Sequence, residues 1–166
     1  MKFLASIALL AATVSAGPLA RRAPKQFTLK TSGAKNDAHN DLYLYSYHTG
    51  AGLSDAVFSD GTANSAHVYL NGTEALVDLG NTFSWGIVAG GDNSYSNWDS
   101  VEINAGASSK GFSIKDGNFI WTRADGFGGW LVCDWVHNAP QLFYLHKNFE
   151  GDLPSSCDKV DLKPEY

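Results

Sequence analysis

The sequence predicts an all-β protein, and three observations favour this class. From Phe27 onward, short stretches of β-branched and aromatic residues alternate with Gly, Asn, Asp and Ser. No stretch keeps apolar residues at the i, i+3, i+4 and i+7 spacing of an amphipathic helix. Asn71-Gly72 and Asp116-Gly117 separate apolar stretches, as in tight hairpin turns. With 44% hydrophobic and 13% aromatic residues, the chain has enough apolar surface for a folded core.

The N-terminus predicts a secreted product. Met1-Lys2 precedes the apolar run Phe3–Ala12 and the small residues Val14-Ser15-Ala16, which are the three parts of a secretory signal. The apolar run is shorter than the ~20 residues that cross a bilayer. We therefore expect cleavage after Ala16, an extracellular or cell-wall location, and no membrane attachment after processing.

Residues 17–22 are expected to form a short pro-segment or linker. They end in the dibasic pair Arg21-Arg22, which is either a processing site cut after Arg22 or an exposed arginine pair. The remaining residues, 23–166, have the length of a single domain.

Two hairpins are the clearest elements. One joins Phe112–Lys115 to Asn118–Trp121 through Asp116-Gly117, which supplies the two positive-φ positions of a type I′ turn. The other joins Val68–Leu70 to Ala75–Leu79 through Asn71-Gly72, with a short bulge at Thr73-Glu74. Further strands are expected at Phe27–Lys30, Leu42–Tyr47, Phe83–Val88, Ser100–Asn104, Trp130–Val136, Gln141–His146 and Lys159–Leu162.

A weak repeat favours one β architecture over another. Similar pieces begin at Phe27, Val68 and Phe112, about 42 residues apart, and each is followed by a turn and another apolar strand. Three hairpin units suit a β-trefoil-like barrel, which is the preferred architecture. A β-sandwich whose strands recur at ordinary intervals is the alternative.

The chain has two cysteines, Cys133 and Cys157, so a secreted product can form one disulfide. Their sequence separation of 24 would make this bond worth roughly 3–4 kcal/mol through lost loop-closure entropy. Asn71-Gly72-Thr73 is the only Asn-x-Ser/Thr triplet and a candidate glycosylation site at Asn71, which is compatible with a turn.

Known catalytic motifs are absent from the sequence, as are nucleotide-binding and calcium-loop motifs. The five histidines are spread singly, so no metal or cofactor is expected. An Asp134 carboxylate near His137 or His146 could act as a general acid–base pair in a small hydrolase. Surface or turn positions are the commoner explanation for such residues.

Aromatic side chains suggest ligand binding. Trp98 and Tyr95 lie in a polar stretch and have the apolar ring faces and hydrogen-bonding neighbours of a sugar platform, although they could also anchor a loop to the barrel wall. Trp130, which follows a glycine-rich segment, is a weaker candidate of the same kind. In the strand Trp130–Val136, alternation places Leu131, Cys133 and Trp135 on one face.

Net charge limits the partners. The whole chain carries −5, and removal of the first 22 residues, with three basic and no acidic side chains, leaves −8. Nucleic acid is therefore not expected as a partner, since its binding needs clustered Lys and Arg. Oligomeric state is left open.

Four segments resemble small secreted proteins of filamentous ascomycete fungi and, more distantly, the phialide-associated cell-wall proteins, some of which are IgE-binding allergens. The segments are Gly111–Phe119, Gly129–Asp134, Gln141–Tyr144 and Cys157–Leu162. The resemblance implies an extracellular, non-catalytic protein at the cell wall or host interface, with the Cys133/Cys157 pair as its only shared special residues. We therefore expect a binding protein for cell-wall polysaccharide or a host surface, with a small hydrolase as the alternative.

Overall fold

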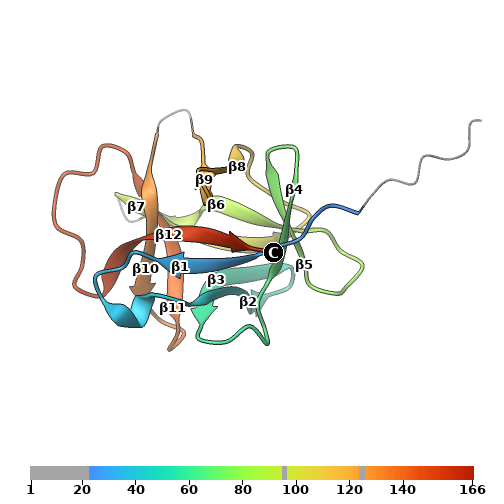
Figure 1. Ribbon diagram of the computed structural model, residues 1–166, viewed down its shortest axis with the longest axis horizontal. Coiled ribbons are helices and arrows are strands. Elements are labelled where there is room, and N and C mark those ends of the chain that lie inside the picture. The colour runs from blue at the N-terminus through green and yellow to red at the C-terminus, as the bar shows by residue number, and fades with distance from the viewer. Residues whose placement is uncertain (1–22, 95–96, 124–125) are drawn as a thin grey trace, which may run out of the picture.

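The computed structural model describes residues 23–94, 97–123 and 126–166, and it confirms an all-β domain. A short 3₁₀ helix, η1 (Asp37–His39), lies between the first two strands. The strands in the described residues are β1 (Thr28–Ser32), β2 (Tyr43–Gly50), β3 (Leu53–Ser59), β4 (His67–Asn71), β5 (Glu74–Asp78), β6 (Trp85–Ser94), β7 (Trp98–Ala105), β8 (Phe112–Lys115), β9 (Asn118–Trp121), β10 (Phe127–Asp134), β11 (Pro140–His146) and β12 (Cys157–Glu165) (Figure 1).

Six strands form a closed ring. β12 pairs with β1, β4 with β5, and β8 with β9, all antiparallel. Isolated bridges join Phe27, the residue before β1, to Val68 of β4, and Glu74 of β5 to Lys110, which precedes β8. β9 lies against β12, where Lys163 donates a hydrogen bond to Asn118. Figure 1 shows the first and last strands side by side. The six strands therefore close a ring, in which β9 and β12 meet through side chains.

The other six strands form three hairpins, β2–β3, β6–β7 and β10–β11. One strand from each hairpin pairs with the next: β3 with β7, β7 with β11, and β11 with β3. Each third of the chain thus supplies two ring strands and one hairpin, beginning at Thr28, Glu74 and Asn118. This is the β-trefoil arrangement that the sequence favoured.

The predicted repeat had one piece out of place. Val68 in β4 and Phe112 in β8 occupy equivalent positions, but Phe27 does not. The Phe27 backbone N–H and C=O bond with those of Val68, at 2.9 and 2.8 Å, so these two residues are neighbours in the barrel. The third equivalent of β4 and β8 is β12. A pattern of apolar residues two apart occurs in most of these strands and therefore could not identify the equivalent ones.

The Asp116-Gly117 turn lies where the sequence predicted it. The β4–β5 turn lies one residue further along the chain than the predicted Asn71-Gly72 turn. Asp116 and Gly117 both have positive φ, 51° and 75°, between the paired residues Lys115 and Asn118. In the β4–β5 hairpin Asn71 pairs with Glu74, so Gly72 and Thr73 form the loop. Gly72 has φ 63° at the first loop position, where a type II′ turn places glycine.

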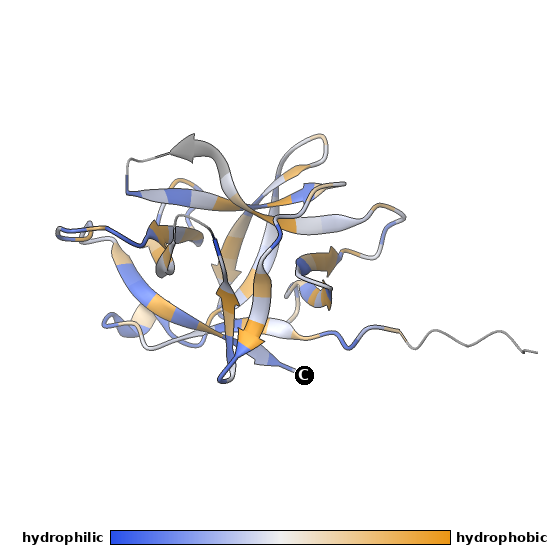
Figure 2. Cartoon of the chain, turned by 90° about the horizontal axis from the view of Figure 1, so that it is seen from above, coloured by the Kyte–Doolittle hydropathy of each residue, from blue (hydrophilic) through white to orange (hydrophobic). Residues whose placement is uncertain are grey.

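The side chains of β10 separate two apolar clusters, as alternation predicted. Trp130 and Val132 belong to the main core. Leu131 and Cys133 face a second cluster with residues of β11 and Cys157, and Phe149 and Leu153 of the β11–β12 loop pack on it with Trp98 and Trp135. Figure 2 shows hydrophobic and hydrophilic residues alternating along several of the strands.

Glycines allow β10 to begin as a bulge. The β10–β11 register shifts between Phe127 and Gly129, and Gly129 has φ 124°. A Cβ on Gly128 would lie 2.5 Å from the His146 carbonyl oxygen. The glycine-rich segment before Trp130 is therefore a close approach of two strands.

Candidate functional site

Three histidines pair with aspartates, in combinations that differ from the prediction. Asp134 does not meet His137 or His146. Within the hairpin, Asp134 is opposite Pro140 whereas His146 is opposite Phe127 at the other end, on the order of 20 Å away at ~3.3 Å per residue. The Asp134 side chain instead lies beside His39, which the sequence analysis did not select.

His137 links two of the three hairpins, β10–β11 and β2–β3. Its Nε2 lies 2.5 Å from Asp55 Oδ2 in β3, and its ring stacks on Tyr47 in β2 at a centroid distance of 4.2 Å. The contact ties the β10–β11 turn to the β2–β3 hairpin.

His146 belongs to a polar network between β11 and β7. Its Nε2 lies 3.1 Å from Asp99 Oδ2, to which the Tyr144 hydroxyl donates, and Arg123 donates in turn to that hydroxyl. Tyr144 is fully buried, and burial first and the Asp99 hydrogen bond second raise the pKa of its hydroxyl. His146 also faces a recess of about 260 Å³ that Asn97, Lys147, Asn148 and Phe149 line.

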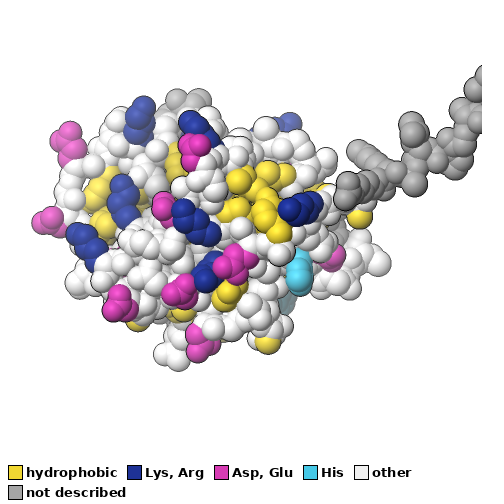
Figure 3. All heavy atoms as spheres, viewed as in Figure 1, with side chains coloured by type: hydrophobic (Ala, Val, Ile, Leu, Met, Phe, Trp, Pro, Cys, Tyr) yellow, Lys and Arg dark blue, Asp and Glu magenta, His cyan; other side chains and the backbone are white. Residues whose placement is uncertain are grey.

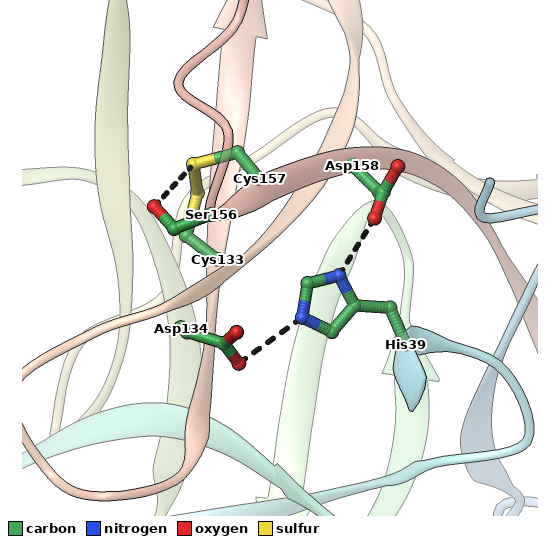
Figure 4. The surroundings of a disulfide bond; sticks show 6 residues. All are labelled: His39, Cys133, Asp134, Ser156, Cys157 and Asp158. Atoms are coloured by element: carbon green, nitrogen blue, oxygen red, sulfur yellow. Dashed lines mark hydrogen bonds and ion pairs between the residues drawn. A yellow bond between two sulfur atoms is a disulfide. The ribbon is translucent and has the colours of Figure 1, made fainter. Parts of the chain in front are cut away.

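His39 is clasped between two carboxylates, as Figure 4 shows. Its side chain is 1% exposed, with Nδ1 2.8 Å from Asp158 Oδ2 and Nε2 3.1 Å from Asp134 Oδ1. Ionised carboxylates only accept hydrogen bonds, so each nitrogen of the His39 ring faces a hydrogen-bond acceptor.

The clasp and the disulfide occupy adjacent positions in the same two strands. Cys133 and Cys157 are directly opposite one another in β10 and β12 and are joined by the predicted disulfide. The next residue in each strand, Asp134 or Asp158, points the other way, since side chains alternate. The cysteines face the second cluster and the aspartates face η1 (Figure 4).

A cleft of about 730 Å³ adjoins this region. The β11–β12 loop, residues 147–156, forms one side. Gly33 and Lys35 of the β1–β2 loop, together with Asp158 and Lys159 of β12, line the remainder. Apolar lining comes from Leu145, Phe149, Leu153 and Pro154. The His39 clasp holds the β1–β2 loop against the strands that carry the disulfide.

Three lysines and two aspartates line the cleft. No ion pair of Lys35, Lys147 or Lys159 occurs within the described residues, whereas Lys30 pairs with Asp41 at 3.0 Å. Of the two acidic residues that line the cleft, Asp158 is bound to His39, and Asp152 is exposed. In Figure 3, Lys and Arg side chains lie beside hydrophobic ones over the β11–β12 loop, with carboxylates at its outer edge.

The predicted ligand-binding aromatics lie elsewhere. Trp98 begins β7, so it is not in a loop, and its ring packs edge-on against Phe149 at 6.1 Å under the β11–β12 loop. Trp130 is 2% exposed, stacks on Phe119 and donates its ring N–H to the Phe119 carbonyl, so no ligand can reach its ring. Tyr95 is outside the described residues. Phe149 is an aromatic residue in a polar loop, which is the sequence pattern that suggested a ligand site at Trp98.

The remaining predicted sites are processing and modification sites. Asn71 is exposed at the end of β4, beside the hairpin loop. Ala16 and Arg22 are outside the described residues. Within the described part of the chain, no group of three or more His, Cys, Asp or Glu side chains could hold a metal ion. No helix in that part is long and apolar enough to cross a membrane.

Comparison with known proteins identifies a family. Neither the curated proteins nor the solved structures gave a match. A family model described as a domain of unknown function (DUF7907) matches residues 24–166, which is most of the chain. The protein therefore belongs to the DUF7907 family.

Proposed function

We propose that this is a secreted fungal binding protein that holds a polysaccharide of the cell wall or a host surface in the cleft beside the β11–β12 loop. The cleft itself is the observation that carries the proposal. Its size, about 730 Å³, is in the range of small-molecule sites. Phe149 and Leu153 offer apolar surface for the C–H faces of sugar rings, and lysine and aspartate side chains offer hydrogen-bonding groups for hydroxyls.

The pairing of Asp134 with His39 removes the support for the alternative, hydrolysis by Asp134 with His137 or His146, which pair with Asp55 and Asp99 instead. Asp134, the acid of the predicted hydrolase, lies beside a histidine that is 1% exposed and has a carboxylate at each ring nitrogen. A general acid or base must reach a substrate atom within hydrogen-bond distance, and this imidazole has no such access.

Retention on insoluble polysaccharide tests the proposal. The secreted protein is incubated with chitin, β-glucan and pectic polysaccharide, and the bound fraction is measured for wild type, Phe149→Ala and Phe83→Ala. Phe83 is 69% exposed in the β5–β6 connection and does not line the cleft, so it is the matched aromatic control. We expect Phe149→Ala to weaken retention at least tenfold and Phe83→Ala to leave it unchanged. Absence of wild-type retention, or equal retention by all three proteins, would contradict the proposal.

A further inference from the structure

We infer that the polysaccharide is polyanionic and is bound as a chain that extends from the cleft into the recess beside His146. This inference rests on the proposed function and names the chemical class of the ligand.

Charge is the first argument. The whole chain has a net charge of −5, yet the cleft contains lysines from three separate segments: Lys35 from the β1–β2 loop, Lys147 from the β11–β12 loop and Lys159 from β12. Two lysines outside the cleft, Lys30 and Lys163, have carboxylate partners at 3.0 and 3.6 Å. The cleft lysines have no such partner among the described residues, and of the two aspartates that line the cleft Asp158 is held by His39 and Asp152 is exposed. An incoming anionic group would therefore meet cations that are not already neutralised.

Continuity of the two recesses is the second argument. The cleft and the smaller recess of about 260 Å³ are both lined by Lys147 and Phe149. The smaller recess adds His146 and the amide side chains of Asn97 and Asn148. A ligand that extends past Phe149 from the cleft into the smaller recess would lie near Lys147 in both. This arrangement suits consecutive acidic sugar residues, with one ring near Phe149 and neighbouring anionic groups near the lysines.

Strand pairing favours a saccharide over an acidic peptide. Peptides often bind by adding a strand to a free sheet edge. Each strand beside the cleft already has two partners: β12 pairs with β1 and β10, β10 with β11 and β12, and β11 with β10 and β7. The cleft therefore presents side chains and offers no strand edge for backbone pairing.

Solution binding to soluble oligomers tests the inference on the folded secreted protein with its disulfide intact. The probes are oligogalacturonates of two, four and eight residues, dextran sulfate fragments, neutral β-glucan oligomers of the same lengths, and oligoglutamate. Calorimetric affinities are compared at low and high sodium chloride. Oligogalacturonate serves as the carboxylate probe and dextran sulfate as the sulfate probe, so their comparison identifies the anionic group.

We expect tighter binding of the longer acidic oligomers and a clear loss of affinity in high salt, since salt screens exposed charges. Lys147→Gln should weaken binding about tenfold because this lysine lines both recesses, and Lys147→Arg should retain most of the affinity. Lys115→Gln is the control, because Lys115 is exposed in β8 and does not line the cleft.

Other outcomes separate the two proposals. Phe149-dependent binding of neutral oligomers, without preference for acidic ones, would overturn the inference and leave the proposed function intact. Oligoglutamate binding as tight as oligogalacturonate, and unaffected by Phe149→Ala, would overturn the saccharide in favour of an acidic peptide. Binding of neither acidic nor neutral saccharide would overturn both proposals.

Discussion

The Nδ1 atom of His39 lies 2.8 Å from Oδ2 of Asp158, although 119 residues separate them in the chain. The contact joins the loop after the first strand to the start of the last strand, one residue beyond the disulfide. Because the β1–β2 loop and β12 both line the cleft, this contact holds two of its walls in a defined relation.

The two carboxylates of the clasp should contribute unequally to stability. The Asp158 side chain is 13% exposed and that of Asp134 is 65% exposed. Asp158→Ala is expected to lower the free energy of unfolding by about 2–3 kcal/mol, since it removes a mostly buried hydrogen bond and leaves a nitrogen of the buried His39 ring without its partner. Asp134→Ala, the matched control, should cost less than about 1 kcal/mol because water screens that pair. Urea unfolding measures both, and equal losses would contradict the burial argument.

Removal of the disulfide should destabilise the domain and loosen the cleft. Cys133→Ala combined with Cys157→Ala is expected to cost about 3–4 kcal/mol, because the bond closes a loop with a sequence separation of 24. The β11–β12 loop lies within that closed segment, so its amide hydrogens should exchange faster in the double variant. Wild-type protein treated with reductant is the control and should behave like the double variant. An unchanged unfolding midpoint would refute this prediction.

The Tyr144 hydroxyl should make stability fall at alkaline pH. Burial and the Asp99 hydrogen bond raise its pKa above the usual value of 10.0, so the folded state favours the protonated hydroxyl. Unfolded chains release this proton as pH passes about 10, so the contribution is complete below that pH and is lost progressively above it. Tyr144→Phe should flatten this decline, and it should lower stability at pH 7 by about 1–3 kcal/mol because Asp99 loses a donor.

Urea unfolding between pH 7 and pH 11 distinguishes these effects. Tyr69→Phe in β4 is the control and should keep the wild-type decline. If Tyr144→Phe kept the same alkaline decline as wild type, the assignment to Tyr144 would be wrong.

Gly128 should not tolerate a side chain. An alanine Cβ at this position would meet the His146 carbonyl oxygen at 2.5 Å, so β10 and β11 would have to separate. We expect Gly128→Ala to cost about 1–3 kcal/mol through this steric conflict. Gly61→Ala is the control, because no atom lies within 4 Å of its added Cβ, and it should change stability by less than about 0.5 kcal/mol. Thermal unfolding of the two variants gives the comparison.

Asn71 should receive a glycan when the protein passes through a eukaryotic secretory pathway. The side chain is exposed beside the β4–β5 loop, where a transferase can reach it. Mass spectrometry should show a glycan mass that is absent from Asn71→Gln and present in Asn64→Gln, an exposed asparagine outside any Asn-x-Ser/Thr triplet. Identical masses for wild type and Asn71→Gln, apart from the substitution itself, would exclude the modification.

Local features of the fold were predictable from the sequence. Asp116-Gly117 indicated its turn because both residues tolerate positive φ. The alternation in Trp130–Val136 separated the residues of the two apolar clusters, and the single pair of cysteines limited the disulfide to one pairing. Phe83 was different: it was expected in a strand with Trp85, but it is exposed just before β6 begins. Strand ends depend on pairing partners as well as on local pattern.

By itself, the sequence determined the all-β class, the hairpin at Asp116-Gly117 and the one possible disulfide, because these depend on periodicity, turn chemistry and a count of residue types. Only the tertiary structure decided which aspartate meets which histidine, that Trp98 lies under Phe149, and that lysines from three segments line one cleft. In the histidine–aspartate pairs the two partners are 47 to 119 positions apart in the chain. Closure of the β-trefoil brings them together. Such distances in the chain leave no local periodicity from which the contacts could be inferred.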